Sequence, residues 1–385
     1  MKKFLVLLGM FLFPTIVFGL SSEVTINGVD SYHLENYSDT DITCESLVCT
    51  LAGGTVKIDY NDEDTTVITL NNYTGKGIYF DATTDLEIVV KGNNTINCNI
   101  EANENNHNDY YGIYSSGSLK VTGNGTLTIN NSNESIVVNE ENLYFNSNVN
   151  INNTGEDGDA VRANTVYVIG GKLNIKNGSS SITCNGSFSL ENGTVKINRS
   201  YNGIVTNDKV NVKKGNLNID TKAIGIYAIN DITVDGGKVV IKVDGPSETG
   251  WGAIGTPGNI NINGGTVDVE VRSDNMFPMN IIINGEYVRK INVAENMYIV
   301  PNGYSSQNRE ASFDVPATVL FLGDSNTTVD VVSDEFVINN LDKHLVITDQ
   351  NPSVNPKTLD NVVYYMFLGL ISICSMFILS KKVTK

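Results

Sequence analysis

The segment from Gly203 to Ile219 reads GIVTNDKVNVKKGNLNI, and it decides the fold. It holds three short alternations of apolar and polar residues, separated by Asn, Asp, Lys and Gly. Such alternation is typical of a strand with one buried and one exposed face. The separating residues favour turns. We therefore expect three short strands within this one segment.

The last of these alternations belongs to a phrase of the form Gly-Xaa-(Leu/Val)-Xaa-Ile, which recurs along the chain. Copies begin at Gly125, Gly171, Gly193, Gly215 and Gly237, and a related copy begins at Gly265. The steps between them are 46, 22, 22, 22 and 28 residues, and Asn148–Ile151 is an intervening copy within the step of 46. A repeat of about 22 residues therefore runs through the middle of the chain.

Three strands in each repeat predict one coil of a parallel β-helix, in which every strand pairs with its counterpart one coil further on. We expect an all-β, single-stranded parallel β-helix of about eight coils over residues 61–274. Each buried aliphatic side chain is worth about 1.5–3 kcal/mol. The inward side chains of one coil are predicted to be Ile204, Val210, Val212, Leu217 and Ile219.

Asparagine is unusually abundant, at 52 of 385 residues. It is a poor helix former but tolerates left-handed backbone, so it suits the corners of a coil. Stacked asparagines can also form side-chain ladders between coils. An AT-rich genome would favour asparagine codons as well, and both causes stay open.

Both ends of the chain carry membrane-directed signals. Residues 1–19 combine two lysines with an apolar run and are typical of a signal peptide, with an uncleaved anchor as the alternative. Residues 362–379 form an uncharged apolar run long enough to cross a bilayer as one helix. The lysines of the tail, residues 380–385, are expected to stay in the cytoplasm. The body is then exported and displayed on the cell surface.

The remaining boundaries follow from where the repeat begins and ends. Residues 20–60 precede it and are expected to form an N-terminal cap. Residues 275–350 alternate without the period and predict a C-terminal β cap or spacer module, followed by a linker at 351–361. Cys44 and Cys49 are close enough to form a disulfide in an exported protein.

The linker resembles the sorting signals of Gram-positive surface proteins through Asn355, Pro356 and Thr358. The resemblance implies that a sortase cleaves after Thr358 and joins it to the cell wall. The residue that follows is Leu359, where these signals usually have glycine. A plain membrane anchor with a linker is the alternative.

The formal net charge of −17 argues against nucleic acid as a partner, because phosphate binding needs a basic face. Without residues 1–19 and 380–385, the exported body has 21 basic and 43 acidic residues, a net charge of −22. That balance favours divalent cations and neutral glycans over acidic ones, unless calcium bridges them.

Several phrases resemble those of secreted bacterial proteins described as carbohydrate-binding domain-containing. They are LNNYTGKGI at 70–78, LEIVVKGNNTI at 86–96, YGIY at 111–114 and GSLKVTGNGTLTI at 117–129. The resemblance covers roughly residues 65–272. It implies the right-handed β-helix of polysaccharide lyases and a protein that binds polysaccharide and calcium without cleaving the sugar.

Glu156, Asp157 and Asp159 form the densest acidic turn of the repeat, flanked by flexible glycines. Calcium prefers several carboxylate and carbonyl oxygens around one point, so these residues are predicted Ca²⁺ ligands, with a solvated turn as the alternative. Arg162 is close in sequence and could act as the base of a lyase, or could pair with Glu156 or Asp159.

Aromatic side chains are candidates for stacking on sugar rings, with packing in corners or core as the alternative. The predicted sugar-binding residues are Tyr111, Tyr114, Tyr201, Tyr227 and Trp251, of which the last three are expected to line one edge of the rod. The leading hypothesis is a non-catalytic, surface-displayed polysaccharide-binding protein. A lyase or glycosidase on the same fold, and an adhesive protein that binds protein partners, are the alternatives.

Overall fold

The computed structural model describes residues 23–350, with internal gaps. The gaps are residues 27–28, 31–41, 46–47, 52–53, 61–63, 83, 99–109, 131, 154–157, 246–251, 274–275, 284–285, 289, 302–309, 315–319, 322–327, 333–334 and 340–343. The predicted signal peptide, linker, span and tail lie outside the described residues. Within the described residues, no helix is long and apolar enough to cross a membrane.

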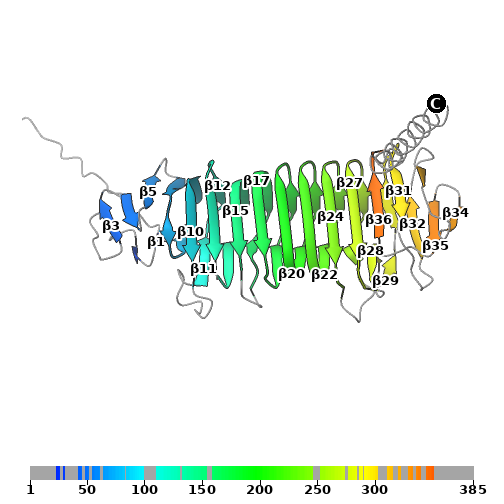
Figure 1. The fold of residues 1–385 in the computed structure, drawn as a ribbon, viewed down its shortest axis with the longest axis horizontal. Helices are drawn as coiled ribbons and strands as arrows, with labels where there is room; N and C mark the ends of the chain where they lie inside the picture. Colours follow the sequence, from blue (N-terminus) through cyan, green and yellow to red (C-terminus); the bar gives the residue numbers. More distant parts are fainter. Residues whose placement is uncertain are drawn as a thin grey trace, which may run out of the picture.

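The described chain is an all-β parallel solenoid of about nine turns with a period of about 22 residues. The coils stack into a rod, with β3 (Ile42–Glu45) near one end and β34 (Thr328–Val332) near the other (Figure 1). The period was predicted correctly from the sequence. The predicted number of coils, about eight, is about one fewer than the number in the structure. Each coil contributes a strand to each of three walls.

The walls differ in the strands that build them. Wall 1 contains β8 (Ile78–Asp81), β11 (Tyr111–Ser115), β14 (Glu134–Val138), β16 (Val161–Ala163), β18 (Ser180–Cys184), the later parts of β20 (Thr194–Thr206) and β22 (Asn216–Ala228), β25 (Gly252–Thr256) and β28 (Phe277–Ile283). Wall 2 contains β6 (Thr65–Asn71), β9 (Asp85–Lys91), β12 (Leu119–Thr122), the first parts of β15 (Leu143–Asn152) and β17 (Val166–Lys176), β19 (Phe188–Leu190), β21 (Val210–Val212), β23 (Ile232–Val234), β26 (Ile260–Ile262) and β30 (Lys290–Val293). Wall 3 contains β7 (Thr74–Gly75), β10 (Asn93–Asn97), β13 (Thr126–Asn130), the later parts of β15 and β17, the first parts of β20 and β22, β24 (Lys238–Val243) and β27 (Thr266–Val271).

Antiparallel strands cover both ends of this stack. At the N-terminal end, β1 pairs with β8, and a meander that ends in β5 pairs with β6. At the C-terminal end, β36 pairs with both β27 and β31. The further strands of these end regions are β1 (Glu23–Ile26), β2 (Val29–Asp30), β4 (Val48–Leu51), β5 (Gly54–Tyr60), β29 (Glu286–Val288), β31 (Tyr298–Pro301), β32 (Glu310–Asp314), β33 (Leu320–Phe321), β35 (Glu335–Asn339) and β36 (His344–Thr348).

The inside of the rod is a continuous apolar column. In-register pairing places like residues over one another, as with Ile197, Ile219 and Ile241 in successive coils of wall 3. The five side chains predicted to point inward in the coil from Ile204 to Ile219 are all at most 3% exposed, which confirms that prediction. Cys184 is also buried and is a free thiol, whereas Cys98 is partly exposed, and its thiol donates to the carbonyl oxygen of Tyr111.

The predicted asparagine ladders are present on the outer surface. In wall 3 the Asn152 side chain donates to Asn130 (2.8 Å), which donates in turn to Asn97 (3.0 Å). A second pair joins Asn174 to Asn150 at 2.8 Å. These contacts run along the rod and tie the outer faces of successive coils together.

Glycines also stack from coil to coil, at the corner between walls 2 and 3. Gly193, Gly215 and Gly237 occupy equivalent positions and all have positive φ, from 78° to 90°. A Cβ atom added at Gly215 would clash with the carbonyl oxygen of Gly193. The corner therefore needs glycine both for its left-handed backbone and for the close approach of the coils.

Gly215→Ala is predicted to lower the free energy of unfolding by about 2 kcal/mol or more, because it adds both a steric clash and an unfavourable φ. Urea unfolding followed by circular dichroism measures the change. Lys214→Ala, at the exposed neighbouring residue, is the control and should have little effect. Equal stability of Gly215→Ala and the wild type would contradict the proposed role of the glycine stack.

The strand β36 is held to the last coil by side chains as well as by its backbone. Nε2 of His344 lies 2.7 Å from Oδ1 of Asp268 on β27. This hydrogen bond, together with the charges of Asp268 and Glu270, raises the pKa of His344 above its ordinary value. Burial and the positive charge of Lys242 act to lower the same pKa, but their combined effect is smaller. The pair therefore stabilises the folded state fully below the unfolded pKa, and this stabilisation is lost as pH rises through the raised pKa.

The stability difference between the wild type and His344→Gln is accordingly predicted to be largest near pH 6 and to shrink by about 0.5–1 kcal/mol by pH 8.5. Urea unfolding at a series of pH values gives this difference. Asp268→Asn should abolish most of the same pH dependence. A difference that stays constant between pH 6 and pH 8.5 would exclude a role for the charged pair.

Candidate functional site

The outer face of wall 3 carries polar side chains on successive coils. Its outward side chains include a set that encloses an open hollow of about 500 Å³, here called the polar trough. It is lined by Thr128, Asn150, Asn152, Asn174, Lys176, Lys196 and Asn198. No carboxylate is among these lining residues, although the chain as a whole is acidic. The trough offers amides, a hydroxyl and ammonium groups.

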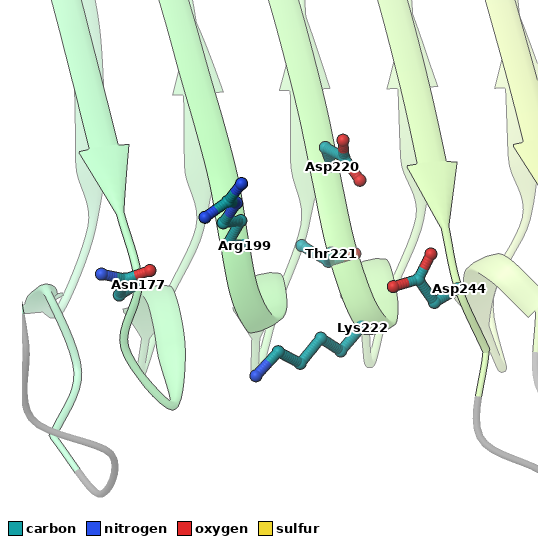
Figure 2. Close-up of a pocket in the computed structure, with 6 residues that line it drawn as sticks. All are labelled: Asn177, Arg199, Asp220, Thr221, Lys222 and Asp244. Atoms are coloured by element: carbon teal, nitrogen blue, oxygen red, sulfur yellow. The ribbon is translucent and has the colours of Figure 1, made fainter.

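A second hollow adjoins the polar trough where wall 3 turns into wall 1. This corner hollow has a volume of about 470 Å³. It is lined by Asn177, Arg199, Asp220, Thr221, Lys222 and Asp244. The two hollows are continuous in sequence, because Asn177 follows Lys176 and Arg199 follows Asn198. Figure 2 shows the corner hollow spread over four successive coils, with the Lys222 side chain reaching towards the coil that carries Arg199.

The acidic side chains that line the corner hollow do not form ion pairs with its basic side chains. Asp220 and Asp244 both pair with Arg272, whose Nη1 lies 3.3 Å and 2.5 Å from their carboxylate oxygens. Within the described residues, the basic side chains of the two hollows and the adjacent Lys172 make no ion pair. These unpaired cations are Lys172, Lys176, Lys196, Arg199 and Lys222. The site is therefore locally positive on an acidic protein.

Two of the predicted sugar-binding tyrosines belong to an aromatic cluster on wall 1. The ring of Tyr114 stacks on Tyr79, with centroids 4.6 Å apart and planes at 14°, and Tyr111 lies 5.2 Å away at 48°. Tyr110 packs edge-on against Tyr111. Stacking occupies one face of Tyr114, so that face is not open to a sugar. Tyr79 could have been found from the repeat, since it pairs in register with Tyr114.

The three aromatic residues expected along one edge do not fall in one column. Tyr227 pairs in register with Val205, whereas Tyr201 precedes Asn202, which pairs with Ile224. Trp251 lies outside the described residues. Tyr201 is 54% exposed and follows Arg199 by two residues, so it lies at the corner that carries the corner hollow. An unpredicted stack, Tyr144 on Tyr167 at 4.9 Å and 6°, lies on wall 2.

Of the predicted calcium ligands, only Asp159 is described. Burial is the largest influence on its carboxyl and raises its pKa, against hydrogen bonds from Thr183 and Ser180 and the charge of Arg162. Arg162 itself pairs with Glu134, with Nη2 2.8 Å from Oε2. Among the described residues its ion-pair partner is therefore Glu134 and not Asp159, while Glu156 lies outside them. Within the described residues, no group of three His, Cys, Asp or Glu side chains could hold a metal ion.

Other predicted positions can be placed only in part. Cys44 and Cys49 are directly opposite each other in the backbone register of β3 and β4, and their side chains are not described. Asn355, Pro356 and Thr358 lie outside the described residues, as do Glu156 and Asp157. The disulfide, the sorting motif and the calcium site stay predictions.

Comparison with known proteins identifies a family for this chain. Residues 40–285, more than half of the chain, match the family described as carbohydrate-binding domain-containing protein. The chain belongs to this family. No curated protein and no solved structure matches the chain. Membership supports a carbohydrate-binding role and a polysaccharide partner.

Proposed function

We propose that this protein binds an acidic polysaccharide, without cleaving it, along the polar trough and the corner hollow. The observation that carries the proposal is the set of unpaired cations among amide side chains on one face of a chain with net charge −17. The net charge alone favours neutral glycans, but the local charge at these hollows is opposite in sign. A ligand responds to the local field when it binds close to the surface.

The side chains of the polar trough match the chemistry of sugars. Sugar hydroxyls donate to and accept from amide groups, while carboxylate or sulfate groups pair with Lys and Arg. Asn174 donates to Asn150 along the ladder, and this bond fixes the orientation of both amides. The Asn150 amino group and the Asn174 carbonyl group then remain for a ligand. Such preorganisation lowers the entropy cost of binding.

The same geometry favours binding over catalysis. Glycoside hydrolysis requires two carboxyl groups placed across the scissile bond. The two carboxylates that line the corner hollow are both engaged by Arg272. Arg162, the residue considered as a lyase base, is engaged by Glu134. The cations that remain unpaired suit the recognition of anionic groups.

The double variant Lys176→Ala/Lys196→Ala is predicted to weaken binding of a polyuronate such as alginate by about tenfold or more, because two charge-assisted contacts are lost. Isothermal titration with a soluble protein of residues 21–350 gives the Kd. Binding to unsubstituted dextran should be weak for both proteins. Failure of the wild type to bind any acidic polysaccharide would refute the proposed function.

The matched control is Lys209→Ala/Lys214→Ala, which removes two exposed lysines from the other two corners. It changes the net charge equally, so retention of its affinity separates a local site from general charge attraction. Absorbance of unsaturated uronate products during the titration tests for cleavage, and none is expected. Calcium binding by Glu156, Asp157 and Asp159 is an added proposal, supported only by the acidic turn. Tighter binding with Ca²⁺ than with EDTA would support it.

We also propose that the body is displayed on the cell surface through the C-terminal apolar run, with Asn355, Pro356 and Thr358 as a sortase motif. The support is the order of signal peptide, motif, apolar run and basic tail. In a Gram-positive host, the full chain is predicted to be sensitive to protease added to intact cells. Thr358→Ala should shift the protein from the wall fraction to the membrane fraction. An unchanged wall fraction would exclude the motif, and protection from protease would exclude display.

A further inference from the structure

The backbone of the corner hollow is irregular around Arg199. Arg199 has φ 62°, a left-handed conformation that is uncommon for residues other than Gly, Asn and Asp. Asn177, at the same corner one coil earlier, has the same φ of 62°. Asparagine tolerates this conformation, whereas arginine at this place is strained. A strained residue on the surface of a site is a reason to look for its function.

The strand register shows how the strain arises. Asn198 pairs with Asp220 and Ser200 pairs with Thr221, so Arg199 is an extra residue without a counterpart in β22. It forms a β-bulge, a feature that redirects a side chain out of the regular alternation. Between Ser200 and Asn202 the register shifts again, and the extra residue then lies in β22 at Lys222 or Ala223.

The residue after the bulge fixes it in place from inside. Ser200 is fully buried, and its hydroxyl donates to the carbonyl oxygen of Asn177 at 3.1 Å and shares a hydrogen bond with Ser181. In the next coil the buried Thr221 hydroxyl donates to the carbonyl oxygen of Ile224 at 3.1 Å. Each bulge therefore has a satisfied, buried hydroxyl beside an outward basic side chain. The two bulges place Arg199 and Lys222 at the same hollow (Figure 2).

We infer that Arg199 is the specificity-determining residue of the corner hollow, where its guanidinium binds an acidic group of the polysaccharide, and that the strained bulge exists to place it there. This inference rests on the proposed function. A guanidinium binds a carboxylate or a sulfate through paired hydrogen bonds, which gives both affinity and direction. Lys222 adds a second positive charge beside it. The left-handed backbone at Arg199 lowers the stability of this coil, and it places the guanidinium where it binds the acidic group.

Three variants separate charge from strain. Arg199→Gln removes the charge but keeps a long side chain in the left-handed conformation, so the Tm should not change while the Kd rises about tenfold. Arg199→Asn copies the residue of the preceding coil, so it should lose the same affinity while the Tm rises by about 2–4 °C. Asn177→Arg imposes the strain on the preceding coil and should lower the Tm by a similar amount.

The measurements are titration with alginate, dextran sulfate and unsubstituted dextran, and calorimetric unfolding of each protein without ligand. Loss of alginate binding alone identifies a carboxylate ligand, and loss of dextran sulfate binding alone identifies a sulfate ester. Unchanged affinity of Arg199→Gln for both acidic polymers would overturn the inference. The proposed function would survive that result if Lys176→Ala/Lys196→Ala still binds weakly. An unchanged Tm in both Arg199→Asn and Asn177→Arg would overturn the strain argument.

Discussion

Pairing of each strand with the equivalent strand one coil away is the constraint on which the rest of the structure depends. It places coils roughly 4.8 Å apart, a distance that leaves no room for a misfit of side chains or backbone at equivalent positions. The identical column of Ile197, Ile219 and Ile241 inside and the stack of glycines at the corner of walls 2 and 3 are both consequences of that spacing. The asparagine ladders outside follow from it as well. Every coil supports its neighbours, and no coil could bury its apolar face alone.

The sequence carries this constraint directly, which is why so much of the fold could be predicted from it. Each repeat of 22 residues with three alternations corresponds to one coil of the stack with three strands. Inward positions such as Val210 and Leu217 could be named because alternation within a strand has a period of two. The number of coils was underestimated because longer coils, such as the one between Ile78 and Ile113, carry extra residues that hide the period.

The site could not be predicted in the same way, because it depends on departures from the repeat. Whether a lysine is free or paired depends on which residues lie one or two coils away, and Arg272 takes Asp220 and Asp244 from 52 and 28 residues distant. The surroundings of the aromatic side chains also depend on which residues the strand register brings together. Tyr201 and Tyr227 are 26 residues apart, whereas strand pairing here joins residues 22 apart, as it does Val205 and Tyr227, so the two rings do not share a column. Tyr114 was identified as aromatic surface, but its stacking on Tyr79 depends on the pairing of β8 with β11.

The corner between walls 3 and 1 is less constrained by the stacking of the coils than the corner between walls 2 and 3. Glycine at the corner of walls 2 and 3 is fixed by the close approach of the coils, so that corner can change little. At the corner of walls 3 and 1 the strands are joined by connections of different length, and the strands on either side keep their pairing from coil to coil. Chain segments that the stack does not constrain are those in which binding residues can be exchanged at little structural cost. Arg199 and Lys222 lie at this corner, where a bulge changes the direction of one side chain and leaves the buried Ser200 and Thr221 in place.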